Sequence, residues 1–141
     1  MRRYLVVANQ TLGGQPLLTR LKSLADDGPV SFFVVVPATP PPHPGAWTHG
    51  EAHAIAEKRL AAALDAFRSL GAQEVDGCVG SQRPMDAIKD ALRDREIDEI
   101  IISTLPAGVS KWLHQDLPHR VARWFELPVS HVIGEKESVA V

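Results

Sequence analysis

The stretch VSFFVVV, residues 30–36, decides the fold class, because six of its seven residues are apolar. A strand without alternating polar side chains is typical of a parallel sheet that is covered on both faces. The segment before it, residues 15–28, spaces its leucines as on one face of a helix and carries Pro16, which suits a first turn. A shorter apolar run at 3–9 precedes that helix. This order predicts a strand, a crossover helix and a second, parallel strand.

The same alternation continues along the chain. We expect helices at 48–71 and 83–96, strands at 72–80, 98–104 and 127–133, and a helical stretch with Trp112 and Trp124 before the last strand. The helices are long enough to connect parallel strands by right-handed crossovers. The sequence therefore predicts an α/β fold. We expect one three-layer α/β/α domain over residues 1–141, with a doubly wound, five-stranded parallel sheet in the order 3-2-1-4-5.

Composition favours a protein of the cytoplasm. The formal net charge of −2 gives no general attraction to nucleic acid or anionic lipid. No apolar run approaches the ~20 residues that a membrane-spanning helix needs, and the start of the chain lacks the pattern of a secretory signal. The single cysteine, Cys78, excludes an internal disulfide and fits a reducing compartment. We expect cytoplasmic localisation, with neither nucleic acid nor a membrane as partner.

Ligands of such sheets bind outside the carboxyl ends of the strands, where the strand order reverses. With the expected order, strands 1 and 4 flank that crevice. The candidate ligand-binding residues in the loops that follow them are Asn9, Thr11, Gly13, Gly14, Ser103, Thr104, Gly108 and Ser110. The side chains among them are neutral, with no carboxylate pair, nucleophile–base pair or set of metal ligands. They suit recognition better than catalysis, so we expect no catalytic residue and no metal site here.

Several landmarks together resemble the universal stress proteins, of the adenine nucleotide alpha hydrolase-like fold. The first lies where that family has a strand followed by a helix start of the form Gly–x–Pro–x–x–Ile, and the others lie near strands 4 and 5. The residues that carry them are Gly80, Pro84, Ala87, Ile88, Asp98, Arg120, Val121, Pro128 and Val129. The resemblance covers nearly the whole chain and implies the same fold. It also implies a homodimer, since members of this family commonly dimerise through strand 5, here Val129 to Ile133.

The ATP-binding branch of that family has a glycine pattern after strand 4, whose backbone N–H groups cradle phosphates. Aligned without gaps, its three glycines correspond to Ile102, Leu105 and Gln115, and its Ser or Thr to Asp116. Asn9 stands where the family has an aspartate that meets the nucleotide. The resemblance therefore points to the branch that lacks the ATP motif, and we expect no cofactor.

An alternative remains for these loops. A gap of one or two residues would bring Gly108 into register, and Thr11 with Gly13 and Gly14 could form a different anion site. Either would allow weak or modified nucleotide binding. The simpler interpretation is that Gly13 and Gly14 form a turn that needs positive φ.

Two other segments stand out. The proline-rich stretch 37–47 is a lid or a docking arm anchored by Trp47, or simply a linker. Pro118 interrupts a helical run and predicts a kink or a break into two helices. Around it, Trp112 and Trp124 belong to an apolar stripe that predicts core packing, with Trp112 alternatively covering the region where phosphate would lie.

We expect a cytoplasmic homodimer that acts as a binding or regulatory module, through a protein partner or an unidentified small ligand. A nucleotide-binding protein with modified loops after strands 1 and 4 is the second hypothesis. An enzyme is the third, and it lacks a visible acid–base or nucleophile constellation.

Overall fold

The computed structural model describes residues 1–38, 49–106, 110–114 and 116–134. Gly108, Gln115, Trp47, most of the proline-rich stretch and the last seven residues lie outside the described residues. The strands are β1 (Arg2–Val7), β2 (Val30–Pro37), β3 (Glu74–Gly80), β4 (Glu99–Thr104) and β5 (Val129–Ile133). The helices are α1 (Gln15–Asp27), α2 (His49–Arg68), α3 (Pro84–Arg93), α4 (Lys111–His114) and α5 (Leu117–Phe125).

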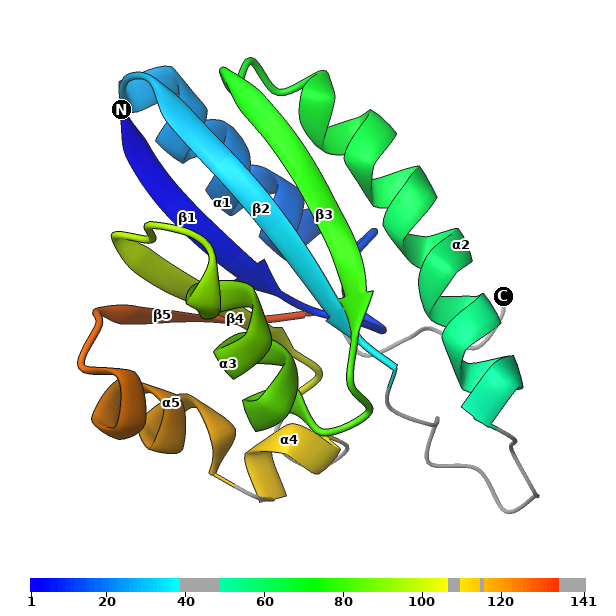
Figure 1. Cartoon of the computed structure of the whole chain (residues 1–141). Helices are drawn as coiled ribbons and strands as arrows, with labels where there is room; N and C mark the ends of the chain where they lie inside the picture. Colours follow the sequence, from blue (N-terminus) through cyan, green and yellow to red (C-terminus); the bar gives the residue numbers. More distant parts are fainter. Residues whose placement is uncertain (39–48, 107–109, 115, 135–141) are drawn as a thin grey trace.

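The five strands form one parallel sheet in the order β3-β2-β1-β4-β5, which confirms the predicted fold class (Figure 1). Helices α1 and α2 cover one face, and α3, α4 and α5 cover the other. The continuous apolar run of β2 follows from this arrangement, because its side chains enter both cores. Strand β5 lies at an edge, as expected.

The glycine and the proline that precede and begin α3, Gly80 and Pro84, each have a structural reason. A Cβ atom at Gly80 would lie 2.7 Å from the Cβ of Ala87 and 3.1 Å from a methyl of Val35. Only a glycine therefore lets α3 approach the end of β3 this closely. Pro84 stands in the first turn of the helix, where its missing N–H costs nothing.

The helical run around Pro118 breaks into two helices, as predicted. Helix α4 ends at His114 and α5 begins at Leu117, so Pro118 falls in the first turn of α5. Between them Asp116 takes a left-handed conformation with φ of 53°. Such a conformation is uncommon for a residue other than glycine, and here it turns the chain between the helices.

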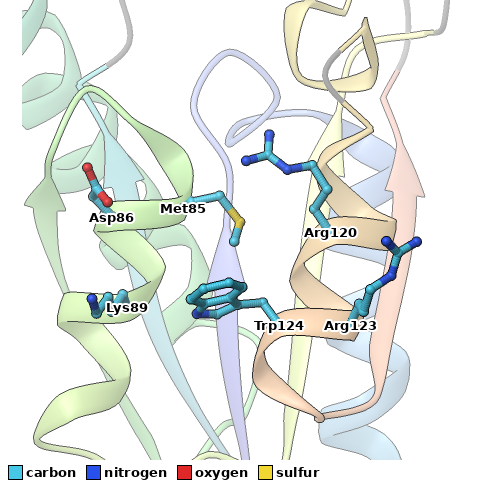
Figure 2. A pocket seen from close by; sticks show the side chains of 6 residues that line it. All are labelled: Met85, Asp86, Lys89, Arg120, Arg123 and Trp124. Carbon is cyan, nitrogen blue, oxygen red and sulfur yellow. The ribbon is translucent and has the colours of Figure 1, made fainter.

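The two tryptophans of the predicted apolar stripe have different fates. Trp112 is 8% exposed and packs in the core between the sheet and α3. Trp124 is 68% exposed, so the prediction that it packs in the core is wrong. The buried face of α5 runs through Leu117, Val121 and the partly buried Phe125, and Trp124 is turned about 100° from Phe125 on the helix. Its ring extends toward α3 instead (Figure 2).

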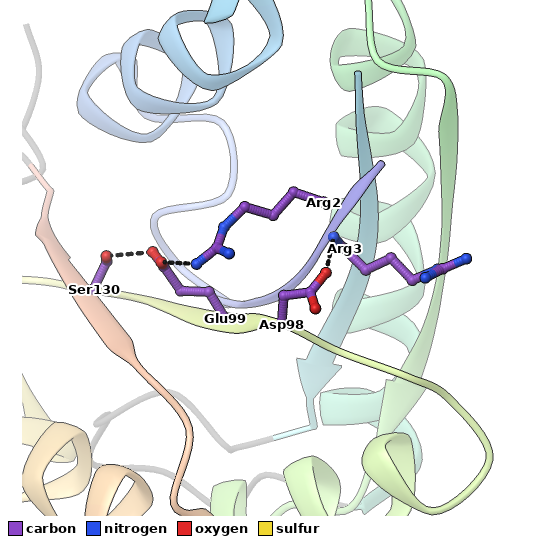
Figure 3. A network of polar contacts seen from close by, with 5 residues as sticks. All are labelled: Arg2, Arg3, Asp98, Glu99 and Ser130. Carbon is purple, nitrogen blue, oxygen red and sulfur yellow. Dashed lines mark hydrogen bonds and ion pairs between the residues drawn. The ribbon is translucent and has the colours of Figure 1, made fainter. Parts of the chain in front are cut away.

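At the amino ends of the strands, polar contacts join the beginnings of β1, β4 and β5 (Figure 3). Arg2 of β1 and Ser130 of β5 both donate to the Glu99 carboxylate, at 2.9 and 2.6 Å. The backbone N–H of Arg3 donates to the Asp98 carboxylate at 2.7 Å, and the Asp98 N–H donates back to the Arg3 carbonyl at 2.8 Å. This is a structural reason for an aspartate directly before β4. In the part of the chain described here, no helix combines the length and apolar character needed to cross a membrane.

Candidate functional site

The loops after β1 and β4 meet because these strands are neighbours, with Val7 opposite Ile102. Asn9 follows β1 and is 7% exposed. Its amide nitrogen donates to the carbonyl of Pro37 at 2.7 Å, and Arg59 of α2 donates to its side-chain oxygen at 2.5 Å. Both ends of this amide are therefore engaged within the chain, and they tie the end of β1 to β2 and α2.

Thr11 and Ser103 join the two loops directly. Their hydroxyl oxygens lie 2.5 Å apart, and both residues are buried. Gly134, just beyond β5, closes over this pair: its N–H donates to the Thr104 carbonyl at 2.6 Å. A Cβ atom at Gly134 would lie 2.6 Å from the Thr11 methyl. The Thr11 side chain is thus enclosed by the chain's own atoms on this side.

Thr104 makes its contact on the other face of the sheet. Its hydroxyl lies 2.7 Å from Nε2 of His131, which comes from the edge strand β5. Partial burial of the imidazole lowers the pKa of His131 below its usual value near 6.5. The ring therefore favours the neutral form, in which Nε2 can accept from or donate to the Thr104 hydroxyl according to its tautomer.

Ser110 has a local structural role. Its hydroxyl accepts a hydrogen bond from the backbone N–H of Leu113 at 3.2 Å, and its own N–H donates to the Pro106 carbonyl at 3.0 Å. This is the pattern of a serine at the start of a helix, where the first N–H groups lack partners inside the helix.

Gly13 and Gly14 do not have the positive φ that the turn interpretation requires, which corrects that expectation. Gly14 is extended, with φ of −75° and ψ of 147°. The glycines with positive φ among the described residues are Gly28 and Gly71. The turn after β1 closes instead through backbone bonds, in which Leu12 donates to the Asn9 carbonyl at 3.3 Å and Gly14 to the Thr11 carbonyl at 3.0 Å.

The positions that correspond to the ATP glycine pattern lie in unlike surroundings. Ile102 is fully buried inside β4, and Leu105 is half-buried after it. Asp116 is exposed, and its carboxylate lies 3.3 Å from Nδ1 of His119. Side chains thus occupy the places where the motif needs bare backbone, and a carboxylate stands at the start of α5.

Five of the eight predicted site residues form side-chain hydrogen bonds: Asn9, Thr11, Ser103, Thr104 and Ser110. The structure joins Thr11 to Ser103, whereas Asn9, Thr104 and Ser110 bond to other parts of the chain. Sequence reasoning missed Arg59 and His131. Each lies far along the chain from its partner, and neither stands in a motif that could have revealed it. Within the described residues, Thr104 and His131 form the one hydroxyl–imidazole contact among these groups, and no carboxylate forms a hydrogen bond with that imidazole. The other side chains hold the loops to neighbouring strands and helices.

No model of a known protein family matches the sequence, and no curated protein matches it. Solved structures do. The universal stress protein from Archaeoglobus fulgidus matches over 94% of this chain and 93% of its own, with 18% identity and a TM-score of 0.59. The structure of the universal stress protein from Archaeoglobus fulgidus in complex with dAMP matches over 94% and 97%, with 19% identity and a TM-score of 0.59.

A universal stress protein in complex with cAMP matches over 93% of this chain and 96% of its own, with 16% identity and a TM-score of 0.60. The near-complete coverage of both chains and the TM-scores of 0.59 to 0.60 establish a shared architecture, although the sequence identity is low. The chain has the fold of universal stress proteins.

Proposed function

We propose that this chain is a universal stress protein-like module, one domain over residues 1–141, which works in the cytoplasm as a homodimer. It acts as a binding or regulatory module and lacks the glycine motif of the family's ATP-binding branch. The observation that carries the proposal is the state of Asn9, whose amide is bonded at both ends inside the chain. The residue that would meet a nucleotide is occupied with holding β2 and α2.

The neighbouring groups support the same conclusion. Thr11 and Ser103 are paired and buried, and Ser110 caps α4. A phosphate site needs N–H donors that are unfilled and approachable, together with a neutral or positive setting. Asp116 supplies the opposite charge at the start of α5.

The homodimer is supported by the edge position of β5. Among the described residues this strand pairs with β4 on one side only, and the other side of such an edge strand presents backbone N–H and C=O groups that proteins normally cover, charge or pair. Ile133 on this strand is 54% exposed. A twofold axis beside β5 would pair the strand with its own copy and extend the sheet across two protomers.

The test is thermal unfolding with and without millimolar ATP, ADP and AMP, each with magnesium. A ligand that binds only the folded state at a hundredfold excess over Kd adds about 2.7 kcal/mol of stability, which corresponds to several degrees in Tm for a domain of this size. We expect no shift with any of them. A reproducible rise with ATP would overturn the proposal.

A second candidate is a nucleotide-binding protein that uses modified loops. It is favoured by Arg59, a cation that reaches the end of β1, and by the neighbours solved with cAMP and dAMP. The same unfolding experiment with cAMP and dAMP separates it from the first. Under this candidate the Tm rises with one of these ligands, and Arg59→Met abolishes the rise while Lys58→Met, the adjacent exposed cation of α2, preserves it.

A further inference from the structure

A surface pocket of about 420 Å³ lies between α3 and α5, and none of the candidate ligand-binding residues that the structure describes lines it. It is lined by Met85, Asp86, Lys89, Arg120, Arg123 and Trp124. Figure 2 shows the Trp124 ring reaching from α5 toward α3, while the Met85 side chain reaches from α3 toward α5. The indole of Trp124 and the thioether of Met85 therefore form the apolar part of the described pocket lining.

The charged side chains that line the pocket are mostly positive. Among the described residues, three cationic side chains and one carboxylate line the pocket, an excess of two positive charges on a chain whose formal net charge is −2. Lys89 and Arg123 are exposed, and neither forms an ion pair with another side chain in the part of the chain that the structure describes. Lys89 lines the pocket from α3 and Arg123 from α5, on either side of the indole (Figure 2).

An exposed tryptophan in a cationic pocket has the composition of an interaction surface. Trp124 leaves 68% of its surface in water, although its helix is otherwise anchored by buried apolar residues. Tryptophan, methionine and arginine are enriched in protein interfaces, and tryptophan and arginine dominate the residues that contribute most to binding. The face thus combines an aromatic anchor with charges that select the sign of the partner.

We propose that this pocket docks a short acidic segment of a partner protein. An apolar side chain of that segment packs on Trp124 and Met85, and its carboxylates pair with Lys89 and Arg123. Charge complementarity carries the choice of partner. Asp86 and the negative net charge disfavour a uniformly anionic polymer such as nucleic acid, and an acidic peptide with an apolar centre can place its carboxylates selectively. The inference deepens the proposed function, since it names the partner class of a binding module.

The test measures fluorescence anisotropy of a fluorescein-labelled peptide in which glutamates flank a central Leu-Phe pair. We expect saturable binding that weakens with added salt, because exposed charges are screened. The variant Lys89→Glu/Arg123→Glu should weaken binding at least about tenfold, and Trp124→Ala by a similar factor. All three positions are exposed, so circular dichroism and thermal unfolding should show each variant folded.

The matched control is Lys58→Glu/Arg20→Glu, which makes the same charge change on exposed positions of α2 and α1, across the sheet. It should keep binding within about twofold. Equal loss in the control would reduce the effect to net charge and overturn the proposal. No binding by the unaltered chain, equal binding of an all-glutamate peptide, or preferential binding of a single-stranded oligonucleotide would also overturn it. These results are independent of the nucleotide titration, so failure here is distinguishable from failure of the proposed function.

Discussion

The hydroxyl of Thr11 lies 2.5 Å from the hydroxyl of Ser103, and both are buried at the carboxyl ends of β1 and β4. Ninety-two positions separate the two residues along the chain. The contact lies at the strand switch point, where related folds receive ligands. In this chain the contact links the two loops, so Thr11 and Ser103, which the sequence predicts as ligand-binding residues, contribute to stability.

Removing one partner of this pair should destabilise the protein. Ser103→Ala leaves the Thr11 hydroxyl buried without its partner, which costs about 1–3 kcal/mol. Thr11→Val should cost a similar amount, and the double variant should cost clearly less than the sum of the two. Urea unfolding of the four proteins measures this. Thr19→Val, an exposed position on α1, serves as the control and should change stability little; strictly additive single changes would contradict the contact.

The close approach of α3 to the sheet predicts a strong effect at Gly80. Gly80→Ala brings a methyl to 2.7 Å from the Ala87 Cβ, too short for two carbons, so the helix must move. Such overpacking costs about 1–3 kcal/mol. Gly13→Ala is the matched change, because a Cβ there meets nothing within 4 Å. Thermal unfolding should show a lower Tm for Gly80→Ala only. A smaller decrease in Tm for Gly80→Ala than for Gly13→Ala would refute the packing argument.

The partly buried imidazole of His131 predicts a pH dependence. Its pKa is lower in the folded protein than the value near 6.5 of a free side chain, so the unfolded chain binds more protons as the pH falls below about 6.5. This contribution to stability is fully present above that pH and is lost as the pH falls toward the lower, folded pKa. Asp116 and His119 line the same pocket as His131.

The measurement is the free energy of unfolding at pH 8.0 and pH 5.5, for the unaltered chain and for His131→Gln. The variant should show a smaller drop between the two pH values. An unchanged drop in His131→Gln would show that another group carries the dependence.

The sheet could be predicted from the sequence because its signals are local. The run at 30–36, the glycine before α3 and Pro118 each constrain a few neighbouring residues, and the strand order then follows from crossover geometry. The polar cluster could be predicted only in part. Asn9 and Thr104 were identified from their positions after strands, whereas Arg59 and His131 come from elements that pack there only once the chain is folded.

Trp124 shows a different limit. Helical spacing places it with the apolar residues of α5, but the register of a helix against a sheet is set by three-dimensional packing that spacing alone does not contain. The core accepts Val121 and leaves Trp124 68% exposed. Single exposed aromatic residues are common on protein surfaces, so the docking proposed for Trp124 rests on the cationic pocket around it, which spacing along the helix does not reveal.

The homodimer gives the last prediction. Ile133→Glu places a charge on the exposed end of β5, and a charge at an edge strand opposes pairing with another strand. Light scattering after size exclusion should therefore show a dimer for the unaltered chain and a monomer for this variant. Trp124→Glu is the matched control, since it converts another large exposed apolar side chain, which extends from α5 toward α3, and should leave the dimer intact. A dimer lost in the control and kept in Ile133→Glu would move the interface to the pocket between α3 and α5, and a second copy of the chain would replace the acidic segment as its occupant.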